Sequence, residues 1–159
     1  MALSIIERRR IEAEILKEVY DVLIETQGVD AARRTVGEAA SRSAVKQGQR
    51  FRDELGREPD LRDFADILPN WTAEDALQIE IHETAADRLS FDVVRCRYAE
   101  MYRAMGLGAI GHLLSCNRDG QFCVGYNPKM SLERTQTIMQ GASHCDFRYS
   151  LAEGEPADE

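Results

Sequence analysis

Apolar residues recur every three or four positions between Ile5 and Glu25, with charged residues between them. This period is typical of an amphipathic helix. Gly28 is expected to end that helix, and a second helical stretch is predicted from Ala31 to Leu55. A short third helix is predicted from Asp60 to Leu68, stopped by Pro69.

Between Ala76 and Cys96 the period changes to an alternation of apolar and polar residues. Alternation predicts strands, and an antiparallel hairpin is expected here with its turn at residues 85–87. Helical spacing returns from Arg97 to Met105, and a short helix is expected from Leu107 to Cys116.

A second hairpin is predicted near the end of the chain. Its strands are expected at Ser131–Gln140, which is rich in Thr, and at Cys145–Leu151, with a turn over residues 141–144. Helices that precede two strand pairs indicate an α+β fold, in which the N-terminal helices pack on one face of a small antiparallel sheet built from two hairpins.

A length of 159 residues fits one core, so residues 1–152 are expected to form a single domain. Residues 153–159 contain no apolar side chain larger than alanine and are predicted to be a mobile acidic tail. The net charge of -8 argues against a nucleic-acid partner, because such binding needs dense basic contacts.

The chain has neither an apolar run long enough to cross a bilayer nor a secretory signal pattern, so we expect a cytoplasmic protein without a membrane partner. In a reducing compartment its four cysteines, at positions 96, 116, 123 and 145, are expected to be thiols rather than disulfides. Whether Ile5, Ile6 and Ile11 belong to the core or to a homodimer interface is left open by the pattern.

Candidate chemistry is concentrated between Cys96 and Tyr149. A cysteine nucleophile needs its thiolate, which a nearby arginine or protonated histidine favours, and Cys116 and Cys145 both have such neighbours in sequence. Each is equally well explained as a buried apolar thiol. Asp119 precedes a glycine, so it is either a turn residue or a carboxylate that orients an amidine or activates water.

A metal site is not predicted. The cysteines form no Cys-x-x-Cys pair, and Cys116, Asp119 and Cys145 would make an irregular ligand set. No cofactor is therefore expected, with zinc as the open alternative.

Several segments, in this order and spacing, resemble the L-2-amino-thiazoline-4-carboxylic acid hydrolase family. The similarity spans roughly residues 75 to 150 and is carried by Asp92-Val-Val-Arg-Cys96-Arg-Tyr98, Cys116-Asn-Arg-Asp119, Asn127-Pro128, Leu132-Glu-Arg134-Thr-Gln-Thr137 and Gly141-Ala-Ser-His-Cys145-Asp-Phe147-Arg. The resemblance implies hydrolytic opening of a small cyclic isothiourea to a carbamoyl-cysteine product.

The resemblance also implies a set of site residues. Asp119, Cys116 and Cys145 are the catalytic candidates, with Asp119 bonded to the amidine and a thiolate or water as the attacking group. A planar donor for the substrate carboxylate is expected from Arg134 or Arg148. The other predicted substrate-binding residues are Cys96, Thr137, His144 and Asp146.

The C-terminal part is also similar to small-molecule-binding domains of the 4-vinyl reductase type. This second resemblance implies the alternative function, a non-catalytic small-molecule sensor. Both alternatives require the same pocket, and the enzymatic alternative predicts that this pocket is largely enclosed and lined by Cys116, Asp119, Arg134 and Cys145.

Overall fold

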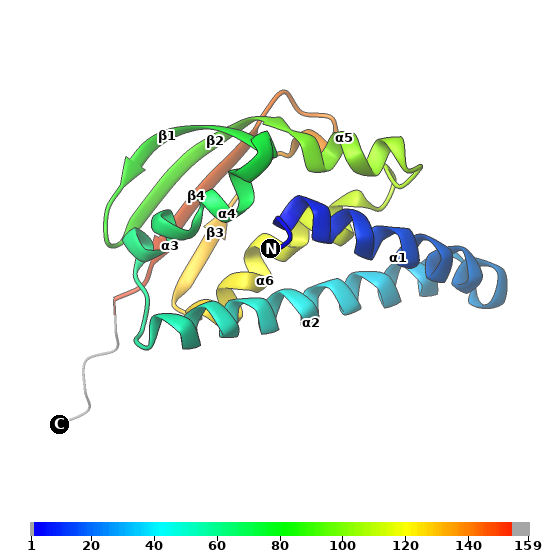
Figure 1. Ribbon diagram of the computed structural model, residues 1–159, viewed down its shortest axis with the longest axis horizontal. Helices are drawn as coiled ribbons and strands as arrows, with labels where there is room; N and C mark the ends of the chain where they lie inside the picture. The colour runs from blue at the N-terminus through cyan, green and yellow to red at the C-terminus, as the bar shows by residue number, and fades with distance from the viewer. Residues whose placement is uncertain (1, 154–159) are drawn as a thin grey trace.

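The computed structural model describes residues 2–153. Its first two elements, α1 (Ile5–Gln27) and α2 (Val29–Leu55), form a long helical hairpin joined at Gly28, whose φ of 91° lies in the region that favours glycine. Figure 1 shows this hairpin extending beyond the rest of the molecule. Ile5 and Ile6 are buried in the core of the chain, whereas Ile11 is 45% exposed.

Two short helices follow, α3 (Leu61–Ile67) and α4 (Pro69–Thr72), and a 3-10 turn at Ala73–Asp75 leads to the sheet. Asp60 caps α3 by accepting hydrogen bonds from backbone N–H groups, as a capping box does. The third helix ends before Pro69, as predicted. Pro69 then begins the separate helix α4, since proline is well tolerated in the first turn of a helix.

The sheet is antiparallel and has the strand order β1-β2-β4-β3. The first hairpin, β1 (Leu77–Thr84) and β2 (Arg88–Cys96), confirms the prediction for residues 76–96. The last strand, β4 (Cys145–Leu151), pairs with β2, so that Phe91 lies opposite Phe147. Because strand side chains alternate, these aromatic residues share the buried face of the sheet and the intervening polar residues share the other.

The predicted second hairpin exists, but its first strand is shorter than expected. β3 covers Met130–Glu133 and pairs with β4, whereas the prediction continued to Gln140. The chain leaves the sheet there because the backbone N–H groups of Thr135 and Gln136 donate to the carboxylate of Asp146 instead of to a neighbouring strand. The region ends in a 3-10 turn at Ile138–Gln140.

The segment after β2 contains a helix that the pattern did not predict. α5 (Arg97–Ala104) is where it was expected, but the helix expected at residues 107–116 is reduced to a π-helical turn at His112–Cys116. This turn continues directly into α6 (Asn117–Tyr126), which includes the Asp119-Gly120 pair that suggested a turn. A π-helical turn is uncommon and often lies beside a functional site.

The helices and the sheet form the expected α+β arrangement. The curved sheet lies at one end of the molecule, with α3, α4 and α6 on its concave side and the α1–α2 hairpin beyond them (Figure 1). The apolar side chains of β2 and β4 pack against aromatic residues of α3 and α6, and this cluster is the larger part of the core. From residue 154 on, the tail predicted to be mobile lies outside the described residues. No helix within residues 2–153 is long and apolar enough to cross a membrane.

The tightest helix packing is between α2 and α6. Gly48 of α2 and Gly125 of α6 lie where the two helices cross, and a Cβ atom at Gly125 would collide with the backbone oxygen of Val45. A Cβ atom at Gly48 would likewise collide with the backbone oxygen of Phe122. Because backbone atoms cannot rotate away as a side chain can, the crossing requires glycine at both positions.

Gly125→Ala is therefore expected to lower the free energy of unfolding by about 2 kcal/mol or more, because the added methyl group overpacks a backbone contact. Gly120→Ala in the same helix is the matched control. A Cβ atom there meets nothing within 4 Å, so its helix propensity should raise stability by roughly 0.5–1 kcal/mol. Urea unfolding of the two variants tests this, and equal effects would contradict the packing argument.

Candidate functional site

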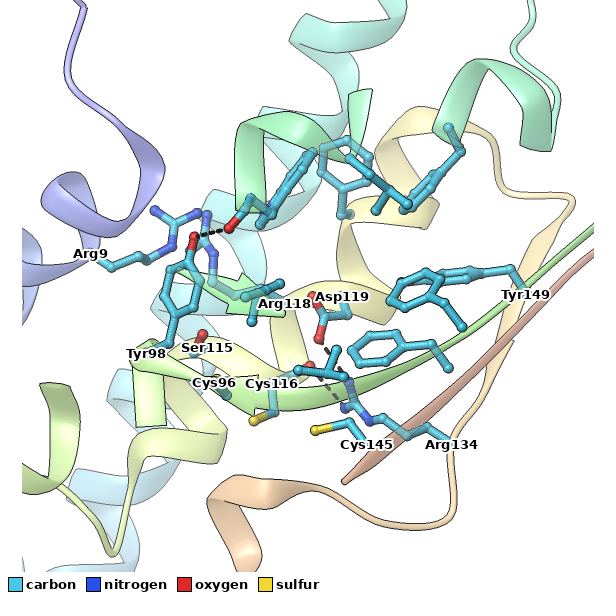
Figure 2. Close-up of a pocket in the computed structure, with 18 of the residues that line it drawn as sticks. Arg9, Cys96, Tyr98, Ser115, Cys116, Arg118, Asp119, Arg134, Cys145 and Tyr149 are labelled. Carbon is cyan, nitrogen blue, oxygen red and sulfur yellow. Dashed lines mark hydrogen bonds and ion pairs between the residues drawn. The ribbon is translucent and has the colours of Figure 1, made fainter. Parts of the chain in front are cut away.

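A pocket of about 80 Å³ lies between the buried face of the sheet and helix α6. Its volume is enough for several waters or one small organic molecule. One part of its wall is aromatic and the other carries the polar side chains labelled in Figure 2. A largely apolar pocket with a few convergent polar groups is the usual form of a small-molecule site. The residues that line it are Arg9, Gln47, Phe64, Leu68, Trp71, Leu77, Phe91, Val93, Cys96, Tyr98, Ser115, Cys116, Arg118, Asp119, Phe122, Arg134, Cys145, Phe147 and Tyr149.

An ion pair between Asp119 and Arg134 lies in the middle of the pocket (Figure 2). Arg134 Nη1 donates to Asp119 Oδ2 at 2.7 Å, and its Nη2 donates to the backbone oxygen of Cys116 at 3.0 Å. The guanidinium carbon is 4.9 Å from the centroid of the Phe147 ring, a cation–π distance. Arg134 is thus held by three groups, and it fixes the position of the Asp119 carboxylate.

Asp119 retains 28% of its side-chain surface accessible, and it lines the pocket. Burial raises the pKa of Asp119 above its ordinary value, because the protein around the pocket solvates the charged form poorly. The nearby positive charge of Arg134 opposes this shift without cancelling it. A carboxyl group with a raised pKa in an apolar pocket is suited to general acid–base chemistry.

Three thiols, those of Cys96, Cys116 and Cys145, also line the pocket. Burial raises the pKa of Cys96 to about 11 and that of Cys116 to about 12, and it raises the pKa of Cys145 as well. Two of the sulfur atoms already accept backbone hydrogen bonds, Cys96 from Ala99 at 3.4 Å and Cys145 from Ile138 at 3.2 Å. At neutral pH these groups are protonated, which disfavours a thiolate nucleophile.

A pair of arginines occupies another part of the pocket wall. Arg9 of α1 and Arg118 of α6 each donate to Gln47 Oε1 of α2, both at 3.1 Å. Tyr98 lies beside them (Figure 2) and donates its hydroxyl hydrogen to the backbone oxygen of Trp71 at 3.1 Å. Arg9 and Arg118 also line a second cavity between α1 and α2, of about 320 Å³.

Five of the nine predicted site residues meet in the pocket: Cys96, Cys116, Asp119, Arg134 and Cys145. They come from the end of β2, the π-helical turn, the start of α6, the loop after β3 and the start of β4. The resemblance therefore predicted a set of residues that the fold brings together.

The other four predicted residues do not line the pocket. Thr137 caps the 3-10 turn by accepting the N–H of Gln140, and His144 contacts the side chain of Gln136. Asp146 holds the loop after β3. Arg148 lies on the other face of the sheet, where its Nη2 donates to Asp92 at 3.0 Å.

The polar residues that the prediction missed are Arg9, Gln47, Tyr98, Ser115 and Arg118. A signal was present for Arg118, because Arg118, Phe122 and Tyr126 follow one another at helical spacing and are all buried. That signal appears only when residues 117–126 are recognised as a helix. Arg9 likewise shares the buried face of α1 with Ile5, Ile6 and Ala13.

The donor set does not favour a metal. Nowhere in the part of the chain that the structure describes do three His, Cys, Asp or Glu side chains come close enough together to hold a metal ion. The Asp119 carboxylate is engaged by Arg134, and the thiols favour the protonated form rather than the thiolate that a metal would need.

Fold and pocket together define a small α+β domain with an internal pocket lined by aromatic and polar side chains. The chain belongs to the L-2-amino-thiazoline-4-carboxylic acid hydrolase family, which it matches over residues 8–149. No curated protein matches it.

Solved structures with a similar fold include the following two. The phenol-responsive sensory domain of the transcription activator PoxR, with phenol, has a TM-score of 0.55 and 13% identity, covering 90% of this chain and 74% of that one. A trafficking protein particle complex subunit 3 from Naegleria fowleri, covalently bound to palmitic acid, has a TM-score of 0.53 and 11% identity, covering 92% and 96%. At these identities the similarity concerns the fold alone.

Cys116 and Cys145 are expected to react slowly with iodoacetamide at pH 7 in the folded protein, because the raised pKa of each thiol leaves little thiolate. The rate should rise about tenfold for each pH unit between 7 and 9, since the thiolate fraction rises in that way below the pKa. Mass spectrometry of the alkylated peptides measures both rates, with the protein unfolded in guanidinium as control. A rate that levels off near neutral pH would show an activated thiolate instead.

Proposed function

We propose that this protein is a hydrolase that opens a small cyclic amidine or isothiourea bearing a carboxylate, such as L-2-amino-thiazoline-4-carboxylate. The observation that carries this proposal is the Asp119 carboxyl group, which lies in the pocket, is oriented by Arg134 at 2.7 Å and has a raised pKa. Membership of the hydrolase family supports the reaction type.

In the proposed reaction the ionised Asp119 accepts a proton from a water molecule as the water oxygen attacks the amidine carbon. A bond from that carbon to ring sulfur or ring nitrogen then breaks, and the leaving atom takes up the proton from Asp119. One water is added and Asp119 returns to its carboxylate form, so the product is a carbamoyl-amino acid. Arg134 acts as a positioning residue, because it holds the carboxylate in place.

The thiols support water attack over covalent catalysis. A cysteine nucleophile would have to ionise against the burial that raises the pKa of Cys116 to about 12. Cys116 and Cys145 therefore serve in this proposal as pocket walls. The three thiols and the aromatic side chains offer apolar contact to a sulfur-containing ring.

A second candidate function is binding without turnover, as in a small-molecule sensor. The stacked rings of Phe91 and Phe147, with centroids 4.8 Å apart, form an aromatic wall on which a planar ligand can lie. The shared fold with a phenol-responsive sensory domain is compatible with this alternative.

Turnover of L-2-amino-thiazoline-4-carboxylate, followed by the mass increase of one water, is expected to fall by a factor of about 100 or more in Asp119→Asn, because the amide cannot accept the proton. Asp92→Asn, the same substitution on the outer face of the sheet, is the matched control and should retain activity. Cys116→Ala and Cys145→Ala should keep turnover within a few-fold of the unsubstituted protein. Loss of turnover in either cysteine variant, with its fold intact, would favour covalent catalysis.

The pH dependence gives an independent check. Activity is expected to decrease as the pH falls through the pKa of Asp119, because the protonated carboxyl group cannot act as a base. Since burial raises that pKa, the decrease should begin at a higher pH than for an exposed aspartate. A kcat/KM profile measures it. A profile that stays flat down to pH 4 would reject Asp119 as the base. Measurable binding without turnover of any cyclic amidine would also reject this role, and it would favour the sensor.

A further inference from the structure

The pocket contains more positive charge than its own side chains neutralise. Arg134 is paired with Asp119, and Arg9 is paired with Glu12 at 3.0 Å, whose side chain is 44% exposed at the surface. Arg118 is only 7% exposed and has neutral partners: the backbone oxygen of Ala40 at 3.1 Å, Ser43 Oγ at 3.5 Å and Gln47 Oε1 at 3.1 Å.

Arg118 also has an unused donor. Among the described residues, its Nε is a buried side-chain nitrogen without a hydrogen-bond partner. A buried donor left unpaired is costly, and it is more costly on a charged group. The pKa of Arg118 is lowered to about 10, first by burial and then by the charge of Arg9, which shares the same acceptor. Both observations describe a guanidinium group that is buried without a directly paired acidic side chain.

Arg134 and Arg148, the two arginines that were expected to bind a substrate carboxylate, are already engaged. Arg134 uses Nη1 on Asp119 and Nη2 on the backbone oxygen of Cys116. Arg148 lies on the face of the sheet away from the pocket, paired with Asp92. Arg118 is therefore the pocket arginine whose unpartnered donor is buried in the described structure.

We infer that Arg118, with Arg9 beside it, forms the subsite that binds the carboxylate of the ligand. The site is thus specific for small organic acids, with the anion at the arginine pair and the ring between Asp119 and the aromatic wall. This inference rests on the proposed function in one respect: the proposed substrate class carries a carboxylate. It concerns binding, however, and holds equally for a ligand that is not turned over.

Calorimetric titration with two pairs of ligands tests the inference. One pair is 2-amino-thiazoline-4-carboxylate and its neutral carboxamide, and the other is benzoate and benzamide. The unsubstituted protein is used throughout, because Asp119→Asn would free Arg134 to bind the acid. Benzoate and benzamide contain no amidine to hydrolyse, so this pair gives the decisive comparison. We expect each acid to bind about tenfold or more tightly than its amide, since hydrogen bonds to a charged group are the strong ones.

In Arg118→Gln the preference for the acid is expected to disappear while the affinity for the amide is unchanged. Arg42→Gln is the matched control, because it removes the same charge from α2 at a side chain that is 76% exposed and pairs only with Glu38 in the described structure. The control should keep the full preference. An acid-to-amide ratio that survives in folded Arg118→Gln would overturn the inference.

A measurement on protein without a substitution at Arg118 covers the case in which Arg118→Gln does not fold. The Nε–H resonance of Arg118, assigned by through-bond correlation to its own side-chain and backbone nuclei, should shift on titration with benzoate and stay in place with benzamide. No shift with benzoate at saturation would overturn the subsite. Absence of turnover with a preserved preference for acids would reject the hydrolase while leaving the subsite intact, so the two failures are distinguishable.

Discussion

The close crossing of α2 and α6 is the constraint on which the pocket depends. Without Cβ atoms at Gly48 and Gly125 the two helix backbones come into direct contact. This contact places the start of α6 against the row of α2 that contains Ala40, Ser43 and Gln47, and Arg118 finds its three neutral partners there. The residue after Arg118 points in a different direction on the helix, which directs Asp119 into the pocket.

The sequence predicted most elements because their patterns depend on local periodicity. The α1–α2 hairpin and the β1–β2 hairpin follow from the spacing of apolar residues alone. In two places a local signal was overruled by tertiary contacts. Asp119-Gly120 suggested a turn but lies inside α6, whose packing on α2 stabilises the helix. The strand predicted up to Gln140 ends at Glu133, because the carboxylate of Asp146 binds the following backbone.

The candidate site was predicted in part for similar reasons. The resemblance identified five residues that line the pocket: Cys96, Cys116, Asp119, Arg134 and Cys145. The predicted site also included Asp146 and Arg148. Strand alternation places these two on the face of the sheet opposite to Phe147 and Tyr149. Arg9 lies outside the motifs, and the motif that contains Arg118 does not show its role, because that role depends on a shared contact with Gln47 that joins three helices.

A single physical effect separates the roles of the residues that the resemblance grouped together. Burial disfavours the charged form of every acid in the pocket, but the chemical consequence differs between thiol and carboxyl. For Cys116 it moves the pKa further above neutral, so the thiolate is suppressed. For Asp119 it moves the pKa upward from a low value toward the range in which a carboxylate is an effective base.

In this proposal the same poorly solvating environment makes the pocket arginines favour an acid over a neutral ligand. A guanidinium group in water gains little from binding a carboxylate, because both ions give up strong hydration. Arg118 has already lost its hydration on folding, and its neutral partners do not replace it with opposite charge. An organic acid that enters the pocket supplies that charge. The desolvation of Arg118 has already taken place on folding, so it does not weaken the binding of the acid. A neutral ligand of the same shape gains nothing from this, which is why acid selectivity is a direct consequence of the α2–α6 packing.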